Sequence, residues 1–173
     1  MVKTLYKGRY LELLDKDGWE YTDRPNATGV VDLVAITDAG ELLFVEQYRV
    51  PFGAPVIELP AGLVGDEDAG EALATAAARE LEEETGYRAA SLTEITKGST
   101  SPGQSTEEMT VFLATGLTKV ADGGGVGDEN ITVHAVALDK AHDWLDQQVA
   151  GGKKIALRVY SGLYFAQRHA GGS

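Results

Sequence analysis

The chain contains no cysteine, which excludes a disulfide framework and a thiolate metal site. It is also poor in basic residues, because 15 Lys and Arg stand against 27 Asp and Glu and give 173 residues a net charge of −12. Nucleic-acid binding requires clustered Lys and Arg, and the only basic pair is Lys153-Lys154. No apolar run approaches a membrane span, and the N-terminal residues alternate too quickly with charge for a signal peptide. We therefore expect a cytoplasmic protein with no nucleic-acid partner and no membrane partner.

Turn residues divide the chain into short strands and three helical segments. Residues 10–23 contain two period-two runs around Asp15–Gly18, which is a hairpin pattern, and residues 30–50 repeat it around a turn at 38–40. Residues 55–65 predict a short strand and then a Pro/Gly-punctuated loop. The other segments are predicted as strands at 91–98, 109–117 and 131–138, loops at 99–108 and 121–130, and helices within 65–87 and at 140–149 and 155–169. This order, with no internal repeat and no linker, predicts a single α+β domain over residues 1–173.

Four glutamates crowd the last turn of the first predicted helix, at positions 80, 82, 83 and 84. Acid at a helix C-terminus faces the negative end of the helix dipole, which costs roughly 0.3–1 kcal/mol per exposed charge. Like charges three or four positions apart repel by a further ~0.2–0.5 kcal/mol per pair. Only Arg79 offers the opposite sign nearby. Helix stability alone does not explain such an arrangement.

Helical geometry separates these glutamates from one another. At about 100° per residue, Glu80 and Glu84 fall within about 20° of Leu73, at the edge of the apolar face. Glu83 lies about 60° further round and Glu82 points away. The predicted apolar face consists of Leu73, Ala74, Ala77, Ala78 and Leu81. A partly desolvated carboxylate beside another must take up a proton or bind a cation such as Mg²⁺; the alternative is a solvated helix face.

The same segment matches the signature of the Nudix hydrolases at each fixed position. The matching residues are Gly65, Glu71, Arg79, Glu80, Leu81, Glu83, Glu84, Gly86 and Tyr87. The chain therefore resembles a family in which a loop–helix–loop, here 65–87, holds divalent cations and hydrolyses a nucleoside diphosphate linked to another moiety. The resemblance implies Glu80 and Glu84 as principal metal ligands and Glu83 as a supporting ligand. Glu83 and Arg79 count among the catalytic residues, with Arg79 orienting the cluster by pairing with an acid such as Glu71.

Flanking segments resemble one branch of that family, the ADP-ribose pyrophosphatases and nucleoside diphosphate sugar hydrolases. These segments are VEQYRVPFGAPVIELPAGLVGDED, TSPGQSTEE and KKIALRVYSGLYFAQRHA. The likeness implies a Nudix fold, with a mixed β-sheet sandwiched between helices and an N-terminal antiparallel β-hairpin extension. It also implies Mg²⁺-dependent cleavage of ADP-ribose to AMP and ribose 5-phosphate, with Mn²⁺ as a substitute ion. A homodimer would form through the N-terminal strands at about 1–28.

Three residues ahead of the signature are candidates for binding substrate or metal. Arg49 ends an apolar strand, where its planar guanidinium could clamp a phosphate or form only a surface salt bridge. Glu58 could hydrogen-bond the substrate or remain solvated. Ala61 and Gly62 are small enough for close backbone approach to a ligand, and the resemblance implies the Ala61 carbonyl as a metal ligand.

Further substrate-binding residues are implied by position in the branch. Trp19 and Tyr21 lie on an early strand, where the resemblance implies aromatic side chains that stack on the nucleobase. Simple sheet packing is the alternative for both. Pro102 and Gly103 belong to the Ser-Pro-Gly loop and are implied to contact substrate.

The general base is expected from the Gly-rich loop at 121–130, because the branch supplies it from a flexible loop outside the signature. Glu129 is the first choice and Asp128 the second, and the glycines would allow closure over substrate. Glu107 and Glu108 are competitors that could instead bind metal or substrate. A solvated loop acid is the alternative for each.

Other functions stay open beside ADP-ribose hydrolysis. GDP-mannose or another nucleotide sugar would keep the same chemistry with a different base. A non-catalytic module that senses nucleotides belongs to another class, but the signature is intact and no basic domain is present. The Ser-Pro-Gly loop and the N-terminal hairpins argue against a nucleoside triphosphate hydrolase or a decapping enzyme.

Overall fold

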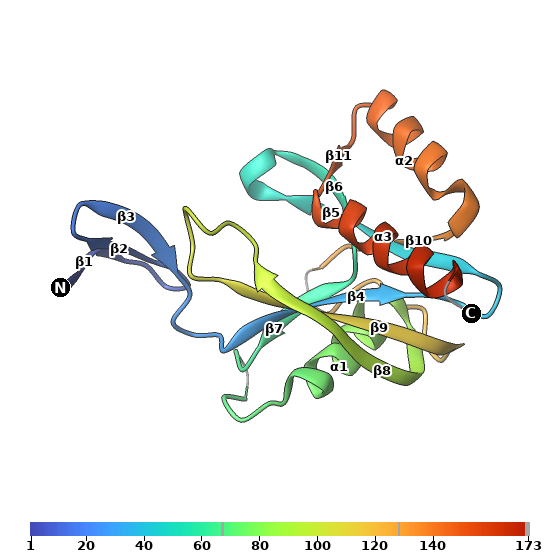
Figure 1. Ribbon diagram of the computed structural model, residues 1–173, viewed down its shortest axis with the longest axis horizontal. Coiled ribbons are helices and arrows are strands. Elements are labelled where there is room, and N and C mark those ends of the chain that lie inside the picture. Colours follow the sequence, from blue (N-terminus) through green and yellow to red (C-terminus); the bar gives the residue numbers. More distant parts are fainter. Residues whose placement is uncertain (67, 128, 172–173) are drawn as a thin grey trace.

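The computed structural model describes residues 1–66, 68–127 and 129–171, which form three β-sheets and three α-helices. The N-terminal sheet has the order β1–β2–β3 and comprises β1 (Val2–Lys7), β2 (Glu12–Lys16) and β3 (Trp19–Asp23). It projects from the rest of the molecule (Figure 1). The predicted hairpin is confirmed as β2–β3. Strand β1 is an addition that the sequence pattern does not mark, because every residue of β1 is exposed and no buried face repeats along it.

The body of the molecule contains two four-stranded sheets, ordered β7–β4–β9–β8 and β10–β5–β6–β11. Their strands are β4 (Gly29–Ala35), β5 (Glu41–Arg49), β6 (Ala54–Glu58), β7 (Ala61–Val64), β8 (Tyr87–Ser99), β9 (Glu108–Lys119), β10 (Thr132–Ala137) and β11 (Lys154–Ile155). Both sheets are mixed, since β4 pairs with β9 and β6 with β11 in parallel, and the other pairs are antiparallel. The predicted α+β class is confirmed, with two mixed sheets instead of one.

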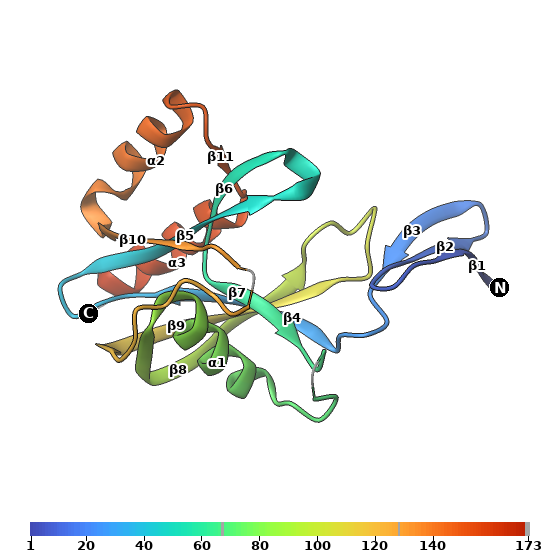
Figure 2. The ribbon, with the colours of Figure 1, turned by 180° about the vertical axis from the view of Figure 1, so that it is seen from behind.

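Helices cover these sheets in two separate cores. Helix α1 (Leu73–Thr85) packs with β4, β7, β8 and β9 around one apolar cluster. Helices α2 (Ala141–Ala150) and α3 (Arg158–Gly171) share a second cluster with β4, β5, β6 and β10. In both views α1 and α2 lie on opposite sides of the molecule (Figures 1 and 2). Within the described residues, no helix is long and apolar enough to span a membrane.

Two predicted connections are wrong. The hairpin expected at 30–50 forms only at its turn, where Ile36 and Leu42 make an isolated bridge, and β4 and β5 then enter different sheets. Strand β4 lies between β7 and β9, and β5 lies between β10 and β6, so the two strands do not pair with each other as a hairpin. Both strands are largely buried. The loop expected after Pro60 is instead β7, whose backbone groups pair with β4.

Helix α1 ends at Gly86, which takes the left-handed φ of 72° and donates its N–H to the Glu82 carbonyl at 2.8 Å. The predicted apolar face is partly wrong, because Ala74 and Ala78 are exposed. Packing against β4, β7 and β8 sets the rotation of the helix. The buried residues are Ala76, Ala77, Leu81, Glu84 and Thr85.

Candidate functional site

A cavity of about 500 Å³ is lined by residues of both four-stranded sheets, α1 and the start of α3. This volume is typical of a small-molecule site. Charged side chains dominate its wall, with acids outnumbering arginines. The acids are Glu58, Asp66, Glu80, Glu84, Glu107 and Glu129, and the arginines are Arg24, Arg49 and Arg158.

Helix α1 brings two glutamates to this cavity, as the helical geometry predicts. Glu84 is 4% exposed, and its Oε2 accepts a hydrogen bond from the Ala61 backbone N–H at 3.0 Å. Glu80 packs against Gly62 so closely that a Cβ at position 62 would lie 1.9 Å from Glu80 Cδ. Strand β7 therefore admits Glu80 only because residue 62 has no side chain. The remaining acid, Glu82, pairs with Arg88 at 3.0 Å on the surface.

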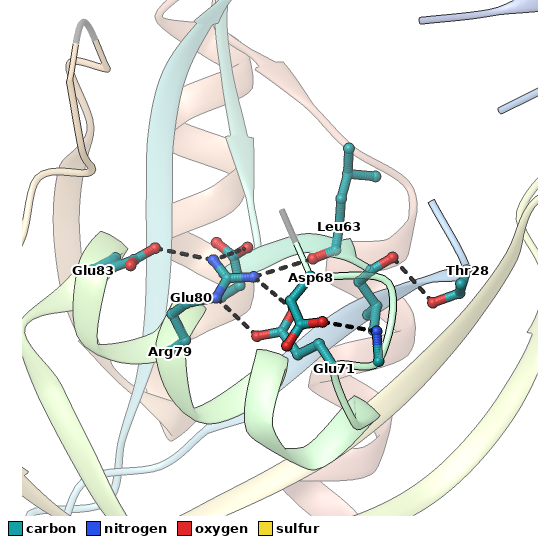
Figure 3. A network of polar contacts seen from close by, with 9 residues as sticks. Thr28, Leu63, Asp68, Glu71, Arg79, Glu80 and Glu83 are labelled. Atoms are coloured by element: carbon teal, nitrogen blue, oxygen red, sulfur yellow. Dashed lines mark hydrogen bonds and ion pairs between the residues drawn. The ribbon is translucent and has the colours of Figure 1, made fainter. Parts of the chain in front are cut away.

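Arg79 lies at the centre of a polar network beside these glutamates (Figure 3). Its Nε and Nη2 donate to the two carboxylate oxygens of Glu71 at 3.0 and 3.2 Å. Its Nη1 donates to Glu80 at 2.8 Å and to Glu83 at 3.1 Å. The hydrogen bonds between Arg79 and Glu71 raise the pKa of Arg79 and lower that of Glu71. The predicted pairing with Glu71 is confirmed, and one guanidinium also holds Glu80 and Glu83.

The positive charge around the two cavity glutamates does not offset the effect of burial on their pKa values. Burial is the main cause that raises the pKa of Glu84 to about 8; the Ala61 hydrogen bond opposes it, and the charges of Glu80 and Glu129 reinforce it. Burial also raises the pKa of Glu80 to about 7, although Arg79 lowers it. Burial therefore disfavours the charged form of each carboxyl group, and a bound cation would favour it again.

This donor set fits a hard divalent cation in type and charge. Carboxylate and carbonyl oxygens, as offered by Glu80, Glu84 and Ala61, are the ligands that Mg²⁺ and Mn²⁺ prefer. Among the described residues, however, no three carboxylate or histidine side chains lie close enough together to coordinate one metal ion. Arg79 accounts for part of this, since it engages both Glu80 and Glu83.

The Gly-rich loop after β9 is bound to the C-terminal end of α1. The backbone N–H groups of Gly124 and Gly125 donate to the carbonyls of Glu84 and Glu83 at 2.9 and 3.0 Å. These bonds satisfy carbonyls that the end of a helix leaves unpaired. The loop and helix α1 therefore form one hydrogen-bonded unit.

Glu129 belongs to this loop and lines the cavity together with Glu80 and Glu84. Its Oε2 accepts the Val126 N–H at 2.9 Å, so the loop backbone fixes the carboxylate. Asp128, the other candidate base in the loop, lies outside the described residues. The predicted closure of this loop over substrate stays a prediction.

The two competitor acids have different ion-pair partners, although both line a neighbouring cavity. Glu107 lines the cavity, with its Oε2 3.6 Å from Arg24 Nε. Glu108 pairs with Lys97 at 2.6 Å and lines a neighbouring cavity of about 360 Å³. Of the two, only Glu107 shares a cavity with the α1 glutamates.

Arg49 and Glu58, both predicted to bind substrate, bind each other. Arg49 Nε and Nη2 lie 2.7 and 2.5 Å from Glu58 Oε2. Glu58 is only 6% exposed, so the alternative of a solvated carboxylate is wrong. Sequence reasoning missed Arg24 and Arg158, which bring two more guanidinium groups to the cavity. Arg158 lies in the C-terminal segment that resembles the family branch, but no local pattern assigns either arginine to this cavity, and the long-range folding of the chain brings both here.

Besides Glu108, four predicted substrate-binding residues do not line this cavity within one chain: Trp19, Tyr21, Pro102 and Gly103. The structure brings the first β3 residue and the Ser-Pro-Gly loop together, since Trp19 Nε1 donates to the Gly103 carbonyl at 3.1 Å. Their contact with substrate stays a prediction.

Residues 27–158 match the family model of the NUDIX domain. The chain is 41% identical to the ADP-ribose pyrophosphatase of Bacillus subtilis (strain 168) over 132 residues, covering 76% of this chain and 70% of the relative. It is 33% identical to the methanol dehydrogenase activator of Bacillus methanolicus over 143 residues, covering 82% of this chain and 76% of the relative. Among solved structures, it is similar to the crystal structure of an ADP compounds hydrolase, with a TM-score of 0.76 and 25% identity over 99% of this chain and 92% of that chain.

Proposed function

This chain belongs to the Nudix hydrolase family, and on that premise we propose that it hydrolyses the pyrophosphate bond of a nucleoside diphosphate sugar. ADP-ribose is the preferred substrate, giving AMP and ribose 5-phosphate. The proposal rests on one cavity that holds the half-buried Glu80 and the buried Glu84 together with Arg49. A diphosphate needs both guanidinium donors and a cation held by acids. Similarity to an ADP-ribose pyrophosphatase and to an ADP compounds hydrolase supports this substrate class.

The proposed cofactor is Mg²⁺, with Mn²⁺ as a substitute. Glu80 and Glu84 would hold it, supported by Glu83 and the Ala61 carbonyl, which are the oxygen donors that such ions prefer. When bound, the ion neutralises charge on the diphosphate and lowers the pKa of a water molecule.

The side chains of this protein perform the remaining steps. Glu129 accepts the proton of the attacking water as general base, from its place beside Glu80 and Glu84 in the cavity. Arg49 binds a phosphate group through its planar guanidinium. Arg79 stays on Glu71 and orients Glu80 and Glu83, so that its role is to position the ligands.

Turnover of a substrate panel tests this function. ADP-ribose, GDP-mannose, NADH, diadenosine polyphosphates and nucleoside triphosphates are incubated with Mg²⁺ and the products separated by chromatography. We expect ADP-ribose to give the highest kcat/KM. A preference for triphosphates would contradict the proposal, and preference for GDP-mannose would keep the reaction and change the substrate.

Glu84→Gln is expected to lower kcat at least about 10³-fold, because the loss of metal-ion charge stabilisation removes several kcal/mol from the transition state. Glu82→Gln is the matched control on the same turn, since Glu82 pairs outward with Arg88. We expect it to retain kcat within about twofold, in line with the small value of exposed pairs. Near-normal activity of Glu84→Gln with Mg²⁺ would refute the ligand assignment.

The proposed assembly is a homodimer in the cytoplasm, made of one Nudix domain per chain and joined through residues at about 1–28. The support is a thin three-stranded sheet that leaves large apolar side chains uncovered. These are Val2, Leu5, Tyr6, Tyr10, Leu11 and Trp19. Large exposed apolar patches mark interaction surfaces, and these side chains belong to one small sheet and the turn between its first two strands.

A further inference from the structure

Arg158, the first residue of α3, lies between two buried acids that belong to different strands. Its Nε is 3.4 Å from Oδ1 of Asp32 on β4, and its Nη2 is 3.3 Å from Oε1 of Glu58 on β6. Asp32 is 1% exposed, and its Oδ1 and the Arg158 Nε and Nη2 atoms are buried without a hydrogen-bond partner. Arg158 is thus a cation shared by both buried acids, and Glu58 is in addition paired with Arg49.

Glu58 connects this arginine to the proposed phosphate-binding residue. One carboxylate oxygen, Oε1, faces Arg158, and the other, Oε2, binds Arg49 Nε and Nη2 at 2.7 and 2.5 Å. Both carboxylate oxygens of Glu58 are therefore contacted, Oε2 by Arg49 and Oε1 by the charge of Arg158, and these contacts limit the orientation of the carboxylate and of the Arg49 guanidinium. Arg49 and Arg158 both line the cavity that contains the α1 glutamates.

We propose that Arg158 is a positioning residue for substrate binding, acting through Glu58 on Arg49. Without Arg158, the carboxylates of Asp32 and Glu58 would face each other with no cation between them, and Glu58 would turn away. Arg49 would then lose the orientation in which it meets a phosphate group. This inference rests on the proposed function, since it assigns Arg158 to the binding of the same diphosphate substrate.

The test compares kinetics of ADP-ribose hydrolysis in the wild type, Arg158→Met and Arg158→Lys. The methionine variant should raise KM at least tenfold while kcat stays within about threefold, since the proposed metal ligands and Glu129 keep their own side chains. The lysine variant should give an intermediate KM, because it keeps the positive charge but not the planar guanidinium group that contacts both acids. Arg168→Met is the matched control near the other end of α3, where Arg168 contacts the exposed Tyr164 side chain, and its KM should equal that of the wild type.

A double-mutant comparison separates positioning from a general loss of structure. If Arg158 acts through Arg49, then Arg49→Met and Arg49→Met/Arg158→Met should have the same KM within about twofold. Calorimetric titration with ADP-ribose in EDTA, where no turnover occurs, should show at least tenfold weaker binding for Arg158→Met. If that variant does not fold, Glu58→Gln replaces it with the same expectation, since it weakens both contacts while keeping the shape.

Each result decides one proposal. An unchanged KM in Arg158→Met, or KM effects of the two arginines that multiply in the double mutant, would overturn the positioning role while leaving the proposed function intact. A wild-type protein that hydrolyses no nucleoside diphosphate sugar with Mg²⁺ would overturn the proposed function. In that case the EDTA titration still reports whether Arg158 supports binding of ADP-ribose.

Discussion

At the scale of single residues, the absence of a side chain at Gly62 decides where Glu80 lies. Gly62→Ala places a methyl group 1.9 Å from the present Glu80 Cδ, so the glutamate must move. A displacement of about 1 Å at a catalytic group can lower the rate about 10²-fold. We expect that loss in kcat/KM for ADP-ribose. Gly98→Ala on β8, where a Cβ meets nothing within 4 Å, is the control and should be near wild type; equal activity of both variants would contradict the close packing.

The general base is a second question at this scale. Glu129→Gln should lower kcat by about 10²–10⁴-fold, which is the usual contribution of a positioned base, and leave the KM for ADP-ribose nearly unchanged. Glu107→Gln removes the other candidate that lines the cavity. If Glu129→Gln keeps the wild-type kcat and Glu107→Gln does not, the base is Glu107.

The sequence predicts those site residues whose placement depends on local geometry. Spacing along α1 brings Glu80 and Glu84 to the helix–sheet junction, and the signature implies the pairing of Arg79 with Glu71; the structure confirms both arrangements. The contact of Asp32 with Arg158 has no local pattern, because it joins a strand near the start of the domain to the last helix. Such a pair can be identified only once the folded structure is known.

At the scale of elements, the end of α1 and the Gly-rich loop depend on each other. Gly123 has a φ of 75°, and a Cβ there would lie 2.4 Å from the Thr85 carbonyl carbon. We expect Gly123→Ala to lower both the free energy of unfolding and kcat, because the loop would detach from the helix and move Glu129. Urea denaturation and steady-state kinetics measure the two effects.

A control within the same loop separates contact from backbone strain. Gly127 also has a positive φ, 62°, but a Cβ there meets nothing within 4 Å. Gly127→Ala should therefore lower the free energy of unfolding only by the cost of a left-handed backbone conformation, roughly 1–2 kcal/mol. An equal loss in both variants would show that the docking of the loop on α1 contributes nothing.

Element boundaries show why a sequence pattern predicts strands better than their partners. The apolar runs of 30–50 predict β4 and β5 correctly as strands, but an apolar run does not identify its neighbour in a sheet. The short strand β7 is missed because Pro60 and Gly62 are typical of loops. Gly62 lies in a strand here for the reason that glycine usually does, namely the close approach of another group.

At the scale of the whole molecule, the projecting N-terminal sheet is expected to bind a second copy. Tyr6→Asp introduces charge on an exposed apolar strand and should convert a dimer to a monomer in analytical ultracentrifugation. Tyr164→Asp, at a comparably exposed tyrosine on α3, is the control and should leave the molecular mass unchanged. A wild type that sediments as a monomer at all concentrations would contradict the dimer.

The position of Arg158 at the start of the last helix has a consequence for the order of folding during synthesis. Asp32 and Glu58 leave the ribosome long before α3, and neither buried acid has this cation until residue 158 emerges. Glu58 still has Arg49 before α3 is made, but Asp32 would be a buried carboxylate without a cation, which is strongly destabilising, so we expect β4 and β6 not to pack tightly in a nascent chain that lacks α3. The substrate cavity then becomes complete only when the final helix docks, so that a partly synthesised chain would not bind the nucleotide.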